Sequence, residues 1–406
     1  WRRTPYQSFD CGRSRGRGGC CAPVDCAPSS AAIPVSRMAV SRMEPPVAPP
    51  GARLRIDLGA LADNWRELAR RAAPARAAAV VKANAYGLGL GPVAGALAEA
   101  GCTEFFVAGL DEALALRALQ PHAAVYALAG VAAGAEAAFV RHHLVPVLNT
   151  VDEVRRWVRH AEGAPAAVQL DTGMTRSGLG ADELDALHAD GNPLARLNFA
   201  LVLSHYACAD EPGHRLNDLQ LERFAALRAR LPPAPTSFAN SAGVLLGEHY
   251  RGDLVRPGIV LYGSDPTSAG GAGAMREVVR LQGRVLQLRD VLEPGVTVGY
   301  GATYRVRPPA RFATVGVGYA DGYLRALGGK GIAVAAGHRV PVVGRVSMDL
   351  LTLDVTRVPV DELAVGHYVD LIGGGVPLDE VARLAGTIGY ELLTRLSSRA
   401  ERVYSR

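Results

Sequence analysis

The chain has 406 residues, of which 49% are hydrophobic and 20% are charged, and its formal net charge is +5. This composition is typical of a globular protein, and so small a net charge gives no reason to expect a nucleic-acid partner. We also expect no membrane span, because charged residues, glycine or proline interrupt the long apolar stretches.

The first fifty residues differ from the rest of the chain and predict a disordered N-terminal extension over residues 1–50. They hold seven arginines and four of the six cysteines, and they end in a proline-rich stretch. The chain opens with Trp1, and the first plausible start residues are Met38 and Met43. The extension is therefore either an upstream translation artefact or an organelle transit peptide, and the sequence does not separate the two.

Between about residues 53 and 265, short apolar runs alternate with helical patterns. Helices are expected over segments such as 111–119, 151–161 and 217–231, and eight strands are expected to begin near Ala77, Glu104, Ala124, Leu144, Ala166, Asn198, Thr236 and Leu254. Eight such units predict an α/β fold, a (β/α)8 TIM-like barrel, which we assign to residues 51–282.

A glycine-rich stretch at 268–273 ends this rhythm, and β patterns bounded by proline and glycine follow it. Strands are expected at about 283–291, 313–319, 339–346 and 368–372. We therefore predict a mostly β C-terminal domain over residues 283–406. The body of the chain keeps only Cys102 and Cys208, in no paired spacing, which favours free thiols and a cytoplasmic location.

Lysine is almost absent: Lys82 and Lys330 are the only two among 44 basic residues. Arginine can supply a positive charge, but it offers no primary amine for covalent chemistry with a carbonyl group. Lys82 follows the apolar run 77–81 at the end of a buried strand, a position typical of Schiff-base lysines. The alternative is a surface lysine kept by chance. Lys330 lies between glycines and is expected at a solvated loop tip.

Other polar residues stand at or just past the C-terminal ends of the predicted strands, where a barrel carries its catalytic residues. These residues are Asn149, Asp171, His205 and Asn240, with Arg256 nearby. The segments 240–243 and 256–259 could each present backbone N–H groups to a phosphate, although either turn alone could be merely structural. A phosphate cradle opposite a Schiff-base lysine predicts a pyridoxal phosphate site.

Two other kinds of site are not supported. The glycines at 87, 89 and 91 have the wrong spacing for a dinucleotide-binding loop, and no acidic residue follows at the required distance. No histidine or cysteine spacing matches a metal site, so we predict no metal.

Several motifs resemble those of alanine racemases, in the same order along the chain and over roughly residues 53 to 404. The first two are Lys82-Ala83-Asn84-Ala85-Tyr86-Gly87 and Asp171-Thr172-Gly173-Met174-Thr175-Arg176. The further motifs are Ser204-His205, Asn240-Ser241-Ala242, Arg256-Pro257-Gly258-Ile259, Tyr300-Gly301-Ala302-Thr303-Tyr304, Gly318-Tyr319-Ala320-Asp321-Gly322, Gly344-Arg345-Val346-Ser347-Met348-Asp349 and Tyr390-Glu391.

The resemblance implies a cytoplasmic homodimer that interconverts L-alanine and D-alanine for peptidoglycan synthesis. Each active site would borrow residues from the partner's β domain. Lys82 would hold pyridoxal phosphate covalently and act as one of two acid/base groups at the substrate Cα, and Tyr300 of the partner subunit would be the second.

The resemblance also implies roles for other residues. Arg256 would face the pyridine nitrogen and His205 would support the hydrogen bonds around the ring. Arg176 would face the cofactor's phenolic oxygen and the substrate carboxylate, and the Met348 backbone N–H would also bind this carboxylate. Tyr319 and Tyr390 would narrow the entry. The phosphate would be held by Tyr86, Ser241, Gly258, Ile259 and Tyr390.

The chain departs from the family pattern at two positions. Gln169 stands where many members carry a carbamylated lysine, so a bound anion such as chloride, or the Gln169 amide oxygen, would have to orient Arg176. Ser347 stands where cysteine is common, which should remove a thiol-directed route of inhibition.

Three related functions stay open at this point. One is a broad-specificity serine/alanine racemase, because one hydroxyl group discriminates weakly in a small apolar pocket. A second is a fold-related decarboxylase, against which Tyr300 and Arg256 argue. The third is a non-catalytic pyridoxal phosphate carrier, which would have no counterpart to residues 283–406.

Overall fold

The computed structural model of this chain describes residues 50–267, 273 and 275–406. The expectations for the N-terminal extension and for the glycine-rich stretch fall almost wholly outside the described residues.

The strands predicted for residues 53–265 form a curled parallel sheet. Within the described residues this sheet has seven strands in chain order, namely β3 (Ala79–Val80), β4 (Glu104–Val107), β5 (Ala124–Ala127), β6 (Val145–Leu148), β7 (Pro165–Gln169), β8 (Asn198–Leu203) and β9 (Thr236–Ser237). Each observed strand begins within two residues of its expected start. The continuous burial of β4 to β7 is typical of parallel strands covered on both faces.

The two ends of this sheet approach each other through a separate parallel pair. β2 (Arg76–Ala77) pairs with β10 (Leu254–Val255), and only Ala78 separates β2 from β3. The Ala78 N–H donates to the Val255 carbonyl at 2.9 Å, and the Arg256 N–H donates to the Ala239 carbonyl at 2.9 Å. The first and last strands therefore meet, and the TIM-like barrel predicted from the sequence is confirmed.

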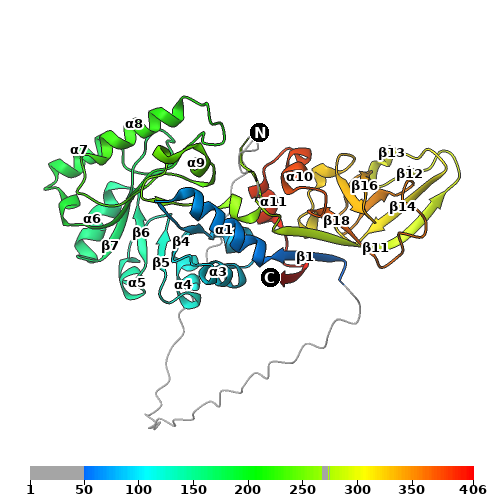
Figure 1. Cartoon of the computed structure of the whole chain (residues 1–406), viewed down its shortest axis with the longest axis horizontal. Helices are drawn as coiled ribbons and strands as arrows, with labels where there is room; N and C mark the ends of the chain where they lie inside the picture. The colour runs from blue at the N-terminus through cyan, green and yellow to red at the C-terminus, as the bar shows by residue number, and fades with distance from the viewer. Residues whose placement is uncertain (1–49, 268–272, 274) are drawn as a thin grey trace, which may run out of the picture. The chain divides into compact units, whose positions relative to one another are not determined.

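Helices cover the outside of these strands (Figure 1). They are α1 (Leu58–Ala72), α3 (Leu90–Glu99), α4 (Leu110–Leu119), α5 (Glu136–Arg141), α6 (Val151–His160), α7 (Ala181–Ala189), α8 (Leu216–Arg228) and α9 (Ser241–Leu246). In α6, Thr150 and Glu153 form a capping box, and the helix buries Val154, Trp157 and Val158. The three helices predicted by range all form, although α8 ends at Arg228, three residues before its expected end.

The second part of the chain is mostly antiparallel, as predicted. An eight-stranded sheet in the described part has the order β14-β17-β16-β15-β18-β11-β1-β19. Its strands are β1 (Ala52–Asp57), β11 (Val279–Val291), β14 (Ala310–Val315), β15 (Ile332–Ala335), β16 (His338–Val343), β17 (Leu351–Asp354), β18 (Tyr368–Ile372) and β19 (Glu401–Ser405). The short pair β12 (Thr297–Val298) and β13 (Tyr304–Arg305) and the helices α10 (Leu378–Ala385) and α11 (Gly389–Arg395) complete this part.

β1 does not lie in the barrel, although the sequence assigned residues 51–282 to that domain. It pairs with β11 and β19 in the second sheet. The physical reason is that buried and more exposed side chains alternate along β1. Ala52, Leu54 and Ile56 are buried and Arg55 is exposed, as in an antiparallel strand with one polar face. The predicted boundary at residue 282 also falls inside β11. The division into residue ranges stays a prediction.

None of the helices in the described part of the chain has the length and apolar composition that crossing a lipid bilayer would require.

Candidate active site

Lys82 lies two residues past the end of β3, at the barrel rim, and begins the short helical segment α2 (Lys82–Tyr86). The four residues after it, 83–86, have φ values of 54° to 55°, which is the left-handed region. Each of these residues carries a Cβ, so this conformation is sterically costly and must be held by its surroundings. One such contact comes from Asn84, whose Oδ1 accepts the Leu90 N–H at 2.8 Å.

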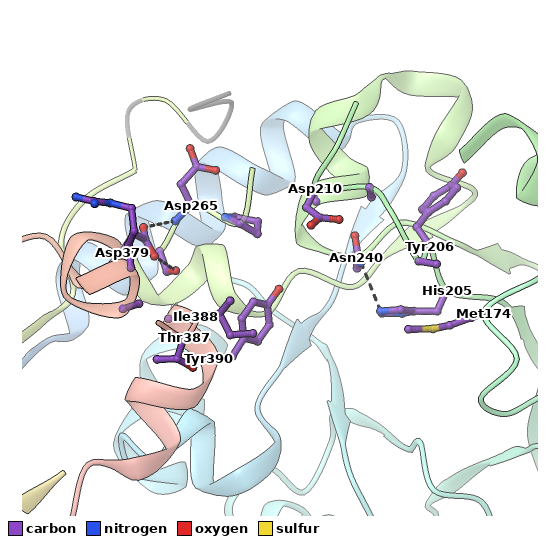
Figure 2. A pocket seen from close by; sticks show the side chains of 18 of the residues that line it. Met174, His205, Tyr206, Asp210, Asn240, Asp265, Asp379, Thr387, Ile388 and Tyr390 are labelled. Carbon is purple, nitrogen blue, oxygen red and sulfur yellow. Dashed lines mark hydrogen bonds between the residues drawn. The ribbon is translucent and has the colours of Figure 1, made fainter. Parts of the chain in front are cut away.

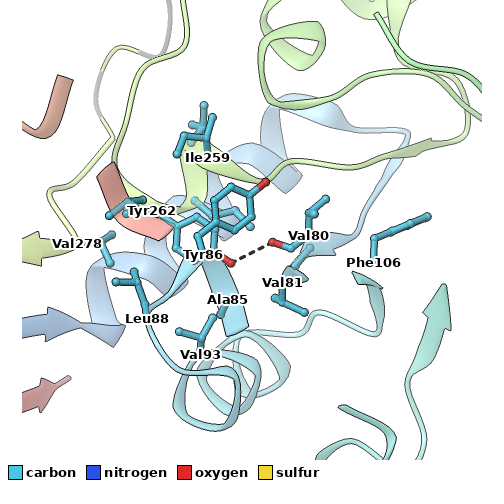
Figure 3. Packing of buried hydrophobic residues seen from close by; sticks show 14 of the residues in the cluster. Val80, Val81, Ala85, Tyr86, Leu88, Val93, Phe106, Ile259, Tyr262 and Val278 are labelled. Carbon is cyan, nitrogen blue, oxygen red and sulfur yellow. Dashed lines mark hydrogen bonds between the residues drawn. The ribbon is translucent and has the colours of Figure 1, made fainter. Parts of the chain in front are cut away.

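The left-handed turn brings Tyr86 back into the core (Figure 3). Its ring lies 4.6 Å from that of Tyr262, and the Tyr262 hydroxyl donates to the Val80 carbonyl at 3.0 Å. Burial raises the pKa of Tyr86 well above its usual value, so the hydroxyl stays protonated and can donate a hydrogen bond. A Cβ at Gly258 would lie 2.4 Å from this hydroxyl oxygen, so only glycine allows the close approach.

Ser241 joins the two segments that were predicted to bind a phosphate group, residues 240–243 and 256–259. Its hydroxyl accepts the N–H of Gly258 at 2.8 Å and that of Val260 at 3.4 Å. Asn240 caps α9, since its Oδ1 accepts the Gly243 N–H at 2.8 Å. Hydroxyl and backbone N–H groups of the two segments therefore lie together at one end of the site.

Arg256 is buried and makes several bonds below the rim. It donates to the Ser237 hydroxyl at 2.9 Å, to the Phe238 carbonyl at 3.2 Å and to the Ser204 carbonyl. Burial, with a smaller contribution from Arg176, lowers its pKa to about 10, so the guanidinium stays charged at neutral pH.

His205 lies between Arg256 and Asn240. Its Nδ1 is 3.4 Å from the Arg256 guanidinium, and its Nε2 is 3.4 Å from the Asn240 amide nitrogen. Burial first, and then the positive charges of Arg256, Arg176 and Lys82, hold the pKa of His205 well below its usual value. The imidazole is therefore neutral at physiological pH. Because a guanidinium can only donate, the Arg256 contact makes Nδ1 the acceptor.

These groups surround one cavity of about 450 Å³. It is lined by all nine residues predicted to bind the cofactor, which are Lys82, Tyr86, Arg176, His205, Ser241, Arg256, Gly258, Ile259 and Tyr390. No aspartate or glutamate is among the described residues that line it, whereas one lysine and two arginines are. A cavity with basic side chains, hydroxyl groups and N–H donors fits a phosphate-bearing aldehyde, so the residues present suit pyridoxal phosphate.

The Lys82 side chain is open to this cavity, although protein surrounds it on the other sides. Partial burial lowers its pKa most, and Arg176 and Arg256 lower it further, whereas Glu112 raises it. A lowered pKa increases the fraction of uncharged amine, which is the form that attacks a carbonyl group. Lys330 is exposed in a turn, as expected.

Gln169 and Arg176 lie at the side of the same cavity. Gln169 is buried, and its amide nitrogen donates to the Ser177 carbonyl at 3.1 Å and to the Ser177 hydroxyl at 2.8 Å. Both amide hydrogens are thus used within the chain. Only the amide oxygen can then act toward Arg176.

Three residues that were predicted to lie at the active site do not line this cavity within the single chain. Tyr300 is 70% exposed, Met348 53% and Tyr319 41%. All three lie in the second part of the chain, among turns between its strands. Their exposure in the single chain makes them candidates for an interface with another molecule.

A second cavity, of about 540 Å³, shares Arg176, His205, Asn240 and Tyr390 with the first. Figure 2 shows Asp265 and Asp379 on one side of it, with Asp210, Asn240 and His205 on the other. Asp379 accepts the Asp265 N–H at 2.8 Å and the Ser264 hydroxyl, which ties α10 to the end of the barrel region. The sequence reasoning missed this cavity, because its acidic residues come from separate segments without a common motif.

Comparison with known protein families gives two matches. The model of the alanine racemase N-terminal domain matches residues 56–266, and that of the C-terminal domain matches residues 278–404. Together they cover most of the chain. The chain belongs to the alanine racemase family.

Individual alanine racemases are similar over most of their length. One from Rhodospirillum rubrum is 49% identical over 359 residues, which is 87% of this chain and 96% of the relative. One from Brucella abortus is 47% identical over 371 residues, which is 87% of this chain and 93% of the relative.

Solved alanine racemase structures are also similar. A structure from Bartonella henselae, with covalently bound pyridoxal phosphate, is 39% identical with a TM-score of 0.83 and covers 88% of this chain and all of its own. One from Pseudomonas aeruginosa is 37% identical, with a TM-score of 0.82 and the same coverage. These similarities confirm an isomerase that uses pyridoxal phosphate. They do not favour the broad-specificity alternative.

Proposed function

We propose that this chain interconverts L-alanine and D-alanine, with pyridoxal phosphate held covalently at Lys82. The observation that carries the proposal is the single cavity in which the Lys82 amine faces the hydroxyl and N–H groups of Ser241 and Gly258. When bound, the cofactor withdraws electrons from the amino acid joined to it, which makes the Cα proton removable.

The residues of this chain hold the cofactor at three places. The phosphate would be bound by the Ser241 hydroxyl, by the N–H groups of Gly258 and Ile259 and by the Tyr86 and Tyr390 hydroxyls. Arg256 would donate to the ring nitrogen and keep it unprotonated, because a charged guanidinium cannot accept a proton. His205 stays neutral beside it and supports this orientation.

Two bases on opposite faces then move the proton. Once the substrate amine has replaced Lys82 on the cofactor, the freed Lys82 amine, with its lowered pKa, would take the Cα proton on one face or return it. Tyr300 of the partner subunit does the same on the other face. Because one base removes the Cα proton from one face and the other delivers a proton to the opposite face, the stereocentre inverts.

Arg176 and the Met348 backbone N–H, the latter from the partner subunit, bind the substrate carboxylate. Tyr319, also from the partner subunit, and Tyr390 narrow the entry. We also propose that the Gln169 amide oxygen, or an anion such as chloride, orients Arg176. The pattern of bonds at Gln169 supports this, since its amide nitrogen is already engaged by Ser177.

The active assembly is a homodimer in which the β domain of one copy completes the site of the other. Exposure of Tyr300 and Met348 in the single chain supports this arrangement. We further propose a cytoplasmic location and a role in supplying D-alanine for peptidoglycan. In the described residues, Cys102 and Cys208 are free thiols, as in a reducing compartment.

The test is loss of circular dichroism from L-alanine incubated with the purified chain and pyridoxal phosphate. We expect decay to the racemate with the wild-type chain and none with Lys82→Ala. Lys330→Ala is the matched control, because it removes the other lysine, and it should keep wild-type activity. A Lys82→Ala variant that racemises alanine at the wild-type rate would refute the proposed role of Lys82.

A further inference from the structure

A carboxylate that does not line the cavity contacts the backbone beside Lys82. Glu112 lies in the first turn of α4, and its Oε1 accepts the Ala83 N–H at 2.7 Å. Its Oε2 accepts the Ala108 N–H at 2.8 Å. Ala108 follows β4 directly, so one side chain joins the end of β4 to the residue after Lys82.

The bond to Ala83 is made where the backbone most needs support. Ala83 is the first of the four consecutive left-handed residues, each of which is disfavoured by roughly 1–2 kcal/mol. Hydrogen bonds to a charged acceptor are stronger than those between neutral groups. A glutamine at this position has only one acceptor oxygen, and its NH₂ group would face the second N–H donor.

The charge of Glu112 also acts on the Lys82 amine. Arg176 and Arg256 line the same cavity as Lys82 and lower its pKa, whereas Glu112 raises it. Its negative charge therefore partly offsets the two guanidinium groups.

We infer that Glu112 is a positioning residue for Lys82, because its carboxylate holds the left-handed turn that begins directly after the lysine and places a negative charge on the residue next to it. Its importance for racemisation rests on the proposed function. The contacts themselves do not depend on that function.

The chain contains a matched control for this inference. Glu153 lies in the first turn of α6 and bridges the barrel rim in the same way. Its Oε1 accepts the Val131 N–H at 3.1 Å, and its Oε2 accepts the Asn149 N–H at 2.6 Å. Glu153 is not among the charged groups that shift the pKa of Lys82, which are Arg176, Glu112 and Arg256. Loss of Glu153 should remove a structural bridge and leave Lys82 unaffected.

The experiment uses the full chain loaded with pyridoxal phosphate, as wild type and as Glu112→Gln, Glu112→Asp and Glu153→Gln. One readout is the pH midpoint of the visible absorption of the cofactor bound at Lys82. The other is the rate of amide hydrogen exchange at Ala83.

For Glu112→Gln we expect the midpoint to fall by roughly half a pH unit or more, because a carboxylate that favours the protonated nitrogen is gone. Exchange at Ala83 should rise by about tenfold. Glu112→Asp keeps the charge but is one methylene shorter, so it should raise the exchange and leave the midpoint near the wild-type value. Glu153→Gln should lower the melting temperature and change neither readout.

The inference is overturned if Glu112→Gln leaves either readout at its wild-type value, or if Glu153→Gln moves the midpoint equally. Failure of the proposed function gives a different result. If the wild-type chain binds the cofactor but does not racemise alanine, both readouts still test Glu112. If it binds no cofactor, exchange at Ala83 alone decides.

Discussion

At the scale of single residues, the site is a set of basic groups whose ionisation is controlled by burial and by one another. His205 shows this most clearly, because three positive side chains and burial all oppose its protonation. Arg256 remains charged nearby because it donates to Ser204, Ser237 and Phe238 within the protein. The neutral imidazole and the charged guanidinium therefore depend on each other.

We predict that His205 makes the folded chain sensitive to acid. Its pKa is lowered on folding, so the unfolded chain binds a proton below about pH 6.5 that the folded chain does not. Stability contributed by this residue is thus present above that pH and is lost as the pH falls. Melting temperatures measured from about pH 8 to about pH 5.5 should decline less for His205→Gln than for wild type.

His160→Gln is the control for this measurement, because it replaces an exposed histidine in α6. It should keep the wild-type decline. Equal slopes for His205→Gln and wild type would contradict the prediction.

At the scale of elements, the short segment α2 concentrates backbone strain at the barrel rim. Sequence periodicity placed Lys82 correctly at the end of a strand, but it did not reveal the left-handed turn. None of residues 83–86 is a glycine, and only Asn84 is of a type that tolerates positive φ, so the sequence does not mark a turn of four such residues. The conformation is imposed by contacts from other elements, such as those of Glu112 on α4 and Tyr262 after β10.

We predict that Ala83→Gly stabilises the fold by up to about 1 kcal/mol. Glycine relieves the steric cost of the left-handed region, although its greater freedom in the unfolded chain offsets part of the gain. The control is Ala115→Gly, at an exposed position in the regular helix α4, which should cost about 1 kcal/mol. Melting temperatures of the two variants should move in opposite directions. A fall of similar size in both would contradict the prediction.

At the scale of the whole molecule, the described chain contains one well-formed half of the proposed site. Nine predicted residues meet in one cavity, whereas Tyr300 and Met348 lie exposed in the second part of the chain. Two copies that exchange these surfaces would complete two sites. This is the symmetric arrangement expected of a homodimer.

We predict that two inactive variants restore activity when they are mixed. Lys82→Ala and Tyr300→Ala should each be inactive, because each removes one base from both sites of its dimer. After subunit exchange, a mixed dimer holds one site with both bases intact, so equal amounts should recover about a quarter of wild-type activity. The measurement is racemisation of L-alanine before and after exchange. If both bases came from the same chain, the mixture would stay inactive.

The sequence by itself determined the fold class, because apolar runs and helical periodicity report directly which faces are buried. It also singled out Lys82 as the candidate reactive amine, since two lysines among 44 basic residues leave almost no choice. The nine predicted cofactor-binding residues that line the cavity followed from the resemblance to alanine racemase motifs.

Only the tertiary structure decided where β1 belongs, how residues 83–86 turn and what Glu112 contacts. Each of these depends on partners far away in the chain, as when β1 pairs with β11 and β19. A local sequence pattern can indicate that a residue is buried, but it does not indicate which distant residues cover it. Folding brings those groups together, and their contacts then set both the strained backbone and the pKa of the amine.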